Sequence, residues 1–254
     1  MIEHFFSGTS GLQIPIPKRD FPPEHAGHSR LAFYSHLFNS IEINSSFYKL
    51  PQAKTLSKWA SEATDNFRFT FKLWKELTHQ KNLTFDSENV NRFFQAINAV
   101  GDKKGCLLIQ FPASITVDNR LGLMRLLSVI REVDKKKEWP LQIEFRHSSW
   151  HAESTYELLS DYNAGLVYQD WPTAATPFIE PITDTVYLRF HGPERGYRGS
   201  YTDDHLQEYA TYVQEWLTDG KEVYAYFNNT AGNALANLQT LNSYVERSAA
   251  TKLT

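Results

Sequence analysis

The chain has very little sulfur, with one cysteine, Cys106, and two methionines among 254 residues. A single cysteine cannot form an internal disulfide or a metal site built from several thiolates. This usage is typical of a reducing compartment, and we expect a cytoplasmic protein. Cys106 begins an apolar run, where we expect it to be a core residue.

Long hydrophobic runs and an excess of basic charge are also lacking. No stretch approaches the roughly 18 uninterrupted apolar residues of a membrane-spanning helix, and the N-terminus MIEHFFSGTSG has no basic flank followed by a long apolar run. Lys and Arg (26) nearly balance Asp and Glu (29), so no global field would hold nucleic acid nonspecifically. We expect no membrane partner, and nucleic acid only at a local basic patch.

Internal repeats, low-complexity tracts and convincing linkers are absent as well. The chain is 41% apolar and 22% charged, which is enough apolar material for a sizeable core and too much for a disordered chain. With no linker to divide it, we expect one domain that spans residues 1–254.

The chain contains many short patterns typical of β-strands. Apolar residues recur with period two in eight runs that stop at turn or polar residues, and helical patterns lie between most of them. Strands that alternate with helices form a parallel sheet, and eight of them in a chain of this length favour closure. The sequence therefore predicts an α/β fold, a single (β/α)8 TIM barrel. The eight runs are HFFSGTS, SIEINSS, RFTFKLW, CLLIQFP, LQIEFRH, AGLVYQD, TVYLRFHG and EVYAYFNN.

The helical patterns are clear in two places and broken in a third. After the fourth run, leucines and other apolar residues recur at three- and four-residue spacing behind a cap at Asp118, and a similar pattern follows a cap at Thr202. Between the sixth and seventh runs, WPTAATPFIEPIT (171–183) contains three prolines, which interrupt a helix. We expect the sixth helix to be missing or irregular.

Strand parity predicts which side chains point into the barrel, because alternate residues face the helices or the lumen. In LQIEFRH (141–147) the alternating apolar residues should pack on helices, which leaves Glu144 and Arg146 inside. Applied to the other runs, the rule also selects Glu42, Asn44, Lys72, Gln110, Asp170, Tyr187, Arg189, His191 and Asn228.

The selected polar groups lie near the C-terminal ends of seven strands, where barrel enzymes place their active sites. An inward charge far from water costs several kcal/mol unless it is paired, so these groups should form one cluster. Two interpretations stay open. The cluster is a ligand site, or pairs such as Glu42 with Arg189 form a structural plug.

The loops after the strands add further candidates. HGPERGYRGSY (191–201) follows the seventh run and contains Arg195 and Arg198, in a region where barrels often bind phosphate. An anionic ligand is the functional interpretation, and a surface loop with solvated arginines is the alternative. His79 follows the third run, where it either contacts a ligand or makes a hydrogen bond within the loop. Tryptophans 74, 150 and 171 follow the third, fifth and sixth runs, as pocket walls or as packed core residues.

Several strings together resemble the YecE-like family, known as domain of unknown function seventy-two. They are GTSG (8–11), FNSIEINSSFYKLP (38–51), FRFTFKLWKELTH (67–79), LLIQFP (107–112), IEFRHSSW (143–150), YLRFHG (187–192) and YAYFNN (224–229) followed by AGNALANL. The resemblance spans nearly the whole chain and implies a TIM barrel without an established activity.

The resemblance also implies a set of motif positions, and the chain departs from the family pattern in one place. Family members usually follow the first motif with an aromatic-rich WSY stretch, whereas this chain has LQIPIP (12–17). We expect a different wall at the first βα loop and a different ligand preference. The implied positions are Glu42, Asn44, Lys72, Thr78, His79, Gln110, Glu144, Arg146, His147, Trp150, Asp170, Arg189, His191, Gly192, Asn228 and Asn229.

The leading hypothesis is an enzyme that acts on a phosphate- or carboxylate-bearing small molecule, since both charge signs gather at one mouth. Glu42, Glu144, Asp170 and His191 would carry the acid–base chemistry. The substrate would be bound by Asn44, Lys72, His79, Gln110, Arg146, Trp150, Arg189, Arg195, Arg198 and Asn228.

Two alternatives compete with this hypothesis. A metal-dependent hydrolase, such as a phosphodiesterase of nucleic acid, could use the carboxylates and histidines. The chain has no HxH or other tight ligand spacing, however, and inward cations repel a metal, so we expect no metal ligands. A nonenzymatic nucleic-acid-binding or ligand-binding module could use the basic loop. The pattern indicates no particular cofactor and no oligomeric state.

Overall fold

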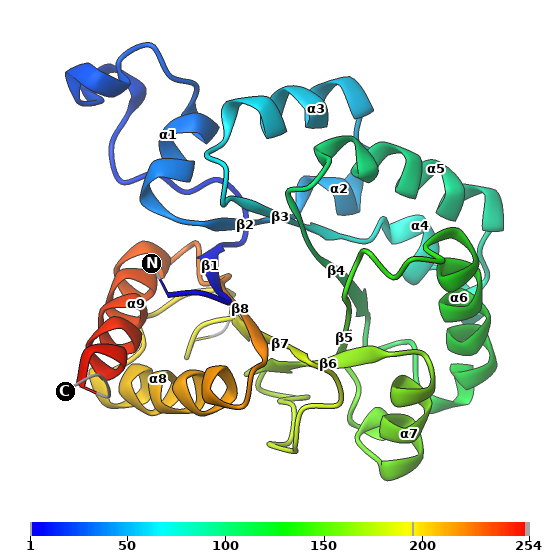
Figure 1. The fold of residues 1–254 in the computed structure, drawn as a ribbon. Helices are drawn as coiled ribbons and strands as arrows, with labels where there is room; N and C mark the ends of the chain where they lie inside the picture. Colours follow the sequence, from blue (N-terminus) through cyan, green and yellow to red (C-terminus); the bar gives the residue numbers. More distant parts are fainter. Residues whose placement is uncertain (1, 195, 252–254) are drawn as a thin grey trace.

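The computed structural model describes residues 2–194 and 196–251, and within them eight parallel strands form one sheet that curls into a nearly closed barrel (Figure 1). Each of the eight predicted runs contains one strand, and helices lie between them on the outside, so the α/β barrel prediction is confirmed. The strands are β1 (Phe5–Thr9), β2 (Ser40–Ile43), β3 (Arg68–Lys72), β4 (Lys104–Phe111), β5 (Leu141–Phe145), β6 (Ala164–Gln169), β7 (Thr185–Phe190) and β8 (Glu222–Phe227).

Helices cover the outer face of the sheet, and short 3-10 turns lie in the loops (Figure 1). None of the described helices has the length and apolar character to cross a membrane. The α-helices are α1 (Arg30–Leu37), α2 (Ser45–Tyr48), α3 (Ala53–Glu62), α4 (Lys75–Thr78), α5 (Ser87–Ile97), α6 (Arg120–Val133), α7 (Glu153–Asp161), α8 (Asp203–Thr218) and α9 (Ala234–Thr251). The 3-10 turns are η1 (Lys18–Asp20), η2 (Pro23–His25), η3 (Lys81–Leu83), η4 (Asn98–Val100), η5 (Val117–Asn119) and η6 (Ser148–Trp150).

The helix starts follow local hydrogen-bonding chemistry. The Thr202 side chain accepts a hydrogen bond from the His205 N–H (3.3 Å) and caps α8 as predicted. The predicted cap of α6 is wrong, because Asp118 lies inside η5. There the Asn119 side chain accepts from the Thr116 N–H (3.1 Å), and α6 begins one residue later, at Arg120.

No helix connects β6 to β7, a segment (170–184) that the structure describes throughout, as its prolines predict. Two hydrogen bonds of Thr176 hold this loop to β6: its N–H donates to the Gln169 carbonyl (2.9 Å) and its hydroxyl to the Val167 carbonyl (2.7 Å). Phe178 then packs against Trp216 of α8, with ring centroids 5.9 Å apart. The loop thus covers part of the sheet that a sixth helix would otherwise cover.

The barrel closes between its first two strands through a close backbone approach. Ser10 and Glu42 form a parallel bridge, and the Gly11 N–H donates to the Glu42 carbonyl (2.8 Å). A Cβ at Gly8 would lie 2.0 Å from the carbonyl oxygen of Ser40. Only glycine permits β1 and β2 to come this near.

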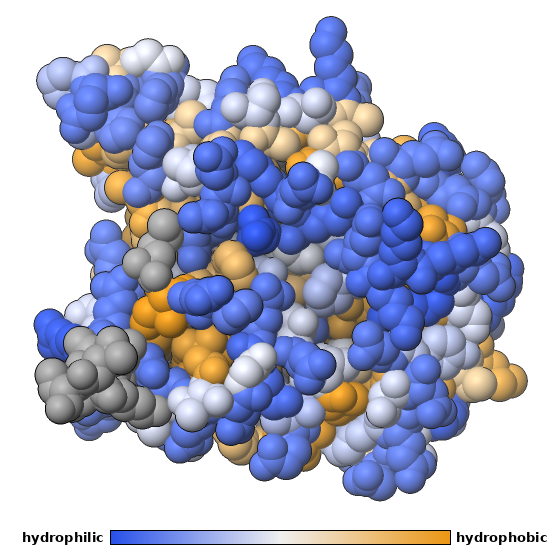
Figure 2. Space-filling view, in the orientation of Figure 1, coloured by the Kyte–Doolittle hydropathy of each residue, from blue (hydrophilic) through white to orange (hydrophobic). Residues whose placement is uncertain are grey.

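Two hydrophobic cores, one between sheet and helices and one in the lumen, confirm for most strands which residues face outward and which face inward. Leu141, Ile143 and Phe145 belong to the large core between sheet and helices. A smaller core fills the lumen with rings and includes Cys106 and Tyr226, whose hydroxyl donates to Thr70 Oγ1 (2.7 Å). The face drawn in Figure 2 is mainly hydrophilic, as expected when apolar residues gather inside. Glu42, Glu144 and Arg189 lie above these rings, toward the mouth, whereas Arg68 and Glu222 lie at the first positions of β3 and β8, at the other end of the barrel.

Candidate site at the mouth of the barrel

Arg189, the second-last residue of β7, lies between two carboxylates from opposite parts of the barrel. Its Nε donates to Glu42 Oε2 (2.9 Å) and its Nη2 to Glu42 Oε1 (2.8 Å). Its Nη1 donates to Glu144 Oε2 (3.0 Å). Arg189 is 2% exposed and both glutamates are 0% exposed. One fork-shaped guanidinium therefore joins β2, β5 and β7 in a buried ion-pair network.

Both glutamates are held in their ionised form. Burial alone would raise the pKa of Glu42, but the charge of Arg189 and hydrogen bonds from Arg189, Ser10 and Tyr187 outweigh it and leave the pKa below its usual value. Burial acts the same way on Glu144, and the charges of Arg189 and Arg146 hold its pKa well below the usual range. Neither carboxylate can donate a proton near neutral pH.

Arg146, just after β5, balances the charge of the network. Its Nε donates to Glu144 Oε1 (2.6 Å), and its guanidinium carbon lies 4.1 Å from the centre of the Trp171 ring. Two arginines thus compensate two glutamates. The Arg146 side chain is 9% exposed, so a small part of it reaches the mouth.

His191, just after β7, bonds to several neighbours at once. Its Nε2 lies 3.1 Å from Arg146 Nη2 and 3.5 Å from Glu144 Oε1, and its Nδ1 lies 3.0 Å from Asn228 Nδ2. Burial lowers the pKa of His191 to about 4, against the opposing charge of Glu144. The ring is neutral near pH 7, with one nitrogen that donates and one that accepts.

Asp170 does not point into the barrel, and its predicted parity is wrong. Val167 lies in the lumen core and Tyr168 in the outer core, so Gln169 is the last inward residue of β6. Asp170 instead accepts hydrogen bonds from the Tyr201 hydroxyl and from the His191 N–H (2.7 Å). Its carboxylate joins the end of β6 to the loop after β7.

Glycine allows the turn of that loop beside His191. Gly192 has a φ of +103°, and a Cβ there would lie 2.2 Å from the Arg198 carbonyl oxygen. The Gly192 N–H donates to the Tyr201 hydroxyl (2.5 Å). The backbone of the loop is therefore packed tightly at its base.

Lys72, the last residue of β3, is a cation without a counter-ion among the residues described. Its ammonium lies 4.2 Å from the centre of the Phe47 ring, and this ammonium group makes no ion pair or hydrogen bond with another described residue. Burial lowers the pKa of Lys72 to about 8, helped by the positive charge of Arg189 and opposed by Glu144 and Glu42. The amine is thus close enough to the ion-pair network to sense its charges.

Three further polar residues surround this amine and the network. His79 packs edge-on against Phe47, with ring centroids 4.7 Å apart, and burial lowers its pKa to about 4. Gln110 of β4 is paired in register with Glu144 and is 8% exposed. The buried Oδ1 of Asn44, just after β2, has no hydrogen-bond partner in the described part of the chain.

Two predicted ligand contacts are not part of this cluster, and a third lies outside the described residues. Trp150 is fully buried, stacks on the outward-facing Phe145 at 4.5 Å and donates from Nε1 to the Ile115 carbonyl (2.9 Å). It packs in the outer core, because the turn η6 brings its ring onto Phe145. Arg198 is exposed on its loop, and Arg195 lies outside the described residues.

Four residues in the network were not predicted as site residues. Ser10, whose hydroxyl donates to Glu42 Oε1, is part of GTSG, and Tyr187, which donates to Glu42 Oε2 (2.5 Å), is inward by parity. Trp171 follows the sixth run, and that position indicated either a pocket wall or a packed core residue. Nothing in the sequence indicated Tyr201, because it reaches Asp170 from a loop.

Two cavities open beside these residues. A cavity of about 330 Å³ is lined by Trp171, His191, Gly192 and their loop neighbours. A larger one, about 880 Å³, lies between the segment after β1 and helix α3, and its lining includes Asn44 and Lys58. The first places His191 and Trp171 next to space that a small molecule could occupy.

The chain is similar to proteins of one family over nearly its whole length. A family model described as "Protein of unknown function DUF72" matches residues 6–253. "UPF0759 protein YunF" of Bacillus subtilis (strain 168) is 27% identical over 248 residues, 85% of this chain and 86% of that protein. "UPF0759 protein YecE" of Escherichia coli (strain K12) is 27% identical over 183 residues, 68% of this chain and 65% of that protein.

Solved structures of the same family share the fold. A DUF72 family protein from Enterococcus faecalis V583 superposes with a TM-score of 0.78 at 19% identity and 95% coverage of both chains. One from Thermotoga maritima MSB8 gives a TM-score of 0.67 at 23% identity, covering 95% of this chain and 99% of the other.

Proposed function

From the premise that this chain belongs to the DUF72 family, whose description states no activity, we propose that it is an enzyme. Its substrate is a small molecule that bears a phosphate or carboxylate group, and its site is the C-terminal mouth of the barrel. The observation that carries the proposal is the Lys72 ammonium, which lies beside a closed ion-pair network and has no counter-ion in the described residues.

An anionic substrate group supplies the charge that Lys72 lacks. The carboxylates of Glu42 and Glu144 are already bound by two arginines, so they do not neutralise a third cation. A partly buried ammonium without a partner is unfavourable. Binding an anion removes that penalty, and the small accessible part of the Arg146 guanidinium adds a second donor.

His191 transfers the proton in this proposal. Its neutral ring lines the 330 Å³ cavity and is held by Asn228 on one nitrogen and by Arg146 and Glu144 near the other. A bound anion raises the pKa of an adjacent imidazole and brings it closer to the working pH. His191 can then act as general base or general acid.

Glu42, Glu144 and Asp170 have positioning roles in this proposal. The two glutamates have no exposed surface, so they orient Arg189 and Arg146 without touching the substrate. Asp170 accepts from the backbone of His191 and fixes the start of its loop. This assignment departs from the sequence-based expectation that these carboxylates carry the acid–base chemistry.

A metal-dependent hydrolase at the mouth is less well supported by the donor set. Both glutamates are bound by guanidinium groups, and Asp170 is bound by Tyr201 and a backbone N–H. Two arginines and Lys72 would repel a cation at the same place. The basic loop needed by a nucleic-acid-binding module includes Arg195, which lies outside the described residues.

Anion-dependent thermal stability tests the proposal without a known substrate. Phosphate, acetate and phosphorylated or carboxylated metabolites are added at constant ionic strength, and the Tm is compared with that in chloride. We expect at least one to raise the Tm of the unmodified protein and of the Lys75→Met control, whose lysine is exposed, but not that of Lys72→Met. An equal rise in Lys72→Met, or no rise in any protein, would contradict the proposal.

A substrate found in this way then tests His191. We expect His191→Gln to lower kcat by about 10²- to 10⁴-fold, the usual contribution of one acid–base group. Its KM should change little, because the anion contacts remain. Unchanged kcat would exclude His191 as the proton-transfer group.

A further inference from the structure

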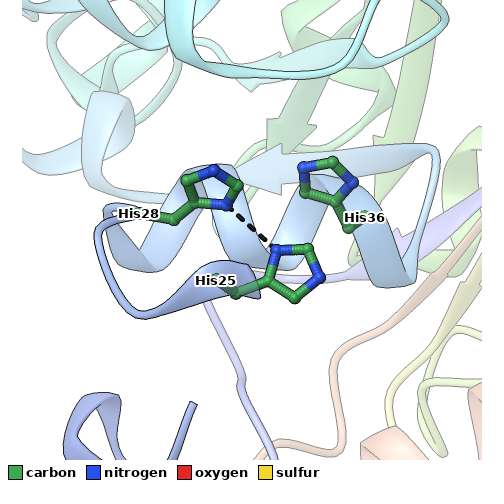
Figure 3. Close-up of side chains that lie close together, drawn as sticks. All are labelled: His25, His28 and His36. Carbon is green, nitrogen blue, oxygen red and sulfur yellow. Dashed lines mark hydrogen bonds between the residues drawn. The ribbon is translucent and has the colours of Figure 1, made fainter. Parts of the chain in front are cut away.

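Three histidines meet on the outer side of helix α1, away from the ion-pair network. His25 ends η2, His28 follows in the turn, and His36 lies in the last turn of α1. In Figure 3 the three rings face one another from these elements. One ring nitrogen of each lies within 4.8 Å of the others, and the Nδ1 atoms of His25 and His28 are 3.0 Å apart.

The rings are packed as a group, and two of them share a hydrogen bond. The centroid of the His25 ring lies 5.0 Å from that of His28 and 4.7 Å from that of His36. Facing Nδ1 atoms at 3.0 Å hold one proton between them, so one of the two presents a lone pair. Burial, and then the charges of His25 and His28, lower the pKa of His36. The cluster is therefore unfavourable in its fully protonated form.

This arrangement matches the requirements of one class of ion. Zinc binds imidazole nitrogens at about 2.0–2.1 Å in tetrahedral geometry, which places two such nitrogens roughly 3.4 Å apart. The nitrogens of the cluster need only small side-chain rotations to reach that spacing. Hard ions such as calcium and magnesium prefer oxygen ligands, and no carboxylate belongs to this cluster among the described residues.

We propose that His25, His28 and His36 bind a divalent transition-metal ion of the zinc class, with one imidazole nitrogen each. Three protein ligands leave a fourth position for water, which His36, the exposed member of the cluster, leaves accessible. The proposal departs from the expectation of no tight ligand spacing and no metal ligands, because His25-x2-His28-x7-His36 is a close spacing. The third ligand was hidden because it lies on the next helix.

The ion has a structural role in this proposal. Residues 11–29 leave the barrel after β1 and return at α1, and they hold the short turns η1 and η2 (Figure 1). An ion bound by His25, His28 and His36 fastens this segment to the helix. Leu12, Lys18 and Ser29 of the same segment line the 880 Å³ cavity, so the ion also holds one wall of that cavity in place.

Calorimetric titration with zinc chloride tests the site on tag-free, chelator-treated full-length protein. We expect about one ion per chain, and at least a 10-fold loss of affinity in His36→Gln, whose side chain is exposed and whose loss should not affect folding. His4→Asn, at an exposed histidine with a φ of 62°, serves as the matched control and should bind as the unmodified protein does.

Limited proteolysis provides a second readout that needs no affinity measurement. Zinc should slow cleavage within residues 11–29 in the unmodified protein and in His191→Gln, but not in His36→Gln. Absence of stoichiometric binding, or binding unchanged in the double variant His28→Gln/His36→Gln, would show that the rings only stack on one another. Because His191 and Lys72 take no part, either result is independent of the anion site at the mouth.

Discussion

Among single residues, Arg189 has the largest predicted effect on stability. Its replacement by methionine leaves the carboxylates of Glu42 and Glu144 buried and without their shared cation. Breaking a buried ion pair by removing one partner costs about 3–5 kcal/mol. We expect Arg189→Met to lower the free energy of unfolding by that amount in urea denaturation at neutral pH.

Two further variants separate charge from packing. Arg198→Met removes an exposed arginine and should change the unfolding free energy by no more than about 0.5 kcal/mol. Adding Glu42→Gln to Arg189→Met should restore part of the loss, because Glu42 is then uncharged and Glu144 keeps its ion pair with Arg146. If Arg189→Met costs less than about 1 kcal/mol, the network does not hold the barrel together.

Parity predicted which residues enter the barrel better than it predicted how deep they lie. It placed Glu42, Glu144 and Arg189 inside, and the structure joins them. It failed at Asp170, because the run was assigned the wrong phase. Leu166 and Tyr168 pack in the outer core and Val167 in the lumen, so alternation puts Gln169 inside and Asp170 outside. Alternation contains no information on depth, so a buried network and an open site could not be distinguished from the sequence.

At the scale of elements, the approach of β1 to β2 depends on one missing side chain. Gly8→Ala would place a Cβ 2.0 Å from the Ser40 carbonyl oxygen, which belongs to backbone and cannot rotate away. We expect the strands to separate and the unfolding free energy to fall by about 3 kcal/mol or more. Gly27→Ala, where a Cβ meets nothing within 4 Å, is the control in the same denaturation series. Equal unfolding free energies of Gly8→Ala and Gly27→Ala would contradict the inference that the barrel closes through this backbone contact.

The regular elements were more predictable than the connections. Periodicity located all eight strands and the long helices α6 and α8, because each has one face on a core. Prolines predicted the loop between β6 and β7. The short helices α2 and α4 and the turns of residues 11–29 are only three or four residues long, too short for any period to emerge. The histidine cluster was missed because it joins the turn that holds His25 and His28 to His36 of α1.

At the scale of the whole molecule, we expect stability to fall on acidification between pH 6.5 and about 4. Burial lowers the folded-state pKa of His191 from 6.5 to about 4, so in this range the unfolded chain binds more protons, and the unfolding free energy rises with pH. The slope contributed by His191 is at most about 1.4 kcal/mol per pH unit. The lowered pKa values of Glu42 and Glu144 extend the loss below pH 4.5.

Urea denaturation at half-unit pH steps measures this dependence. His191→Gln should flatten the slope above pH 4 and leave the loss below it, whereas His4→Asn should reproduce the unmodified profile. A slope that is the same in all three proteins would mean that His191 has the same pKa in the folded and the unfolded chain, and would contradict the lowered pKa of its buried ring.

The bonds between Glu42 and Arg189 join residues 147 positions apart, and this separation matters while the chain is being made. At about 5–20 residues per second, Glu42 leaves the ribosome roughly 7–30 s before its partner. During that interval its carboxylate must stay hydrated, which keeps water between the early strands. We therefore expect the lumen to close at this level only after β7 has been synthesised, when Arg189 can pair with both glutamates.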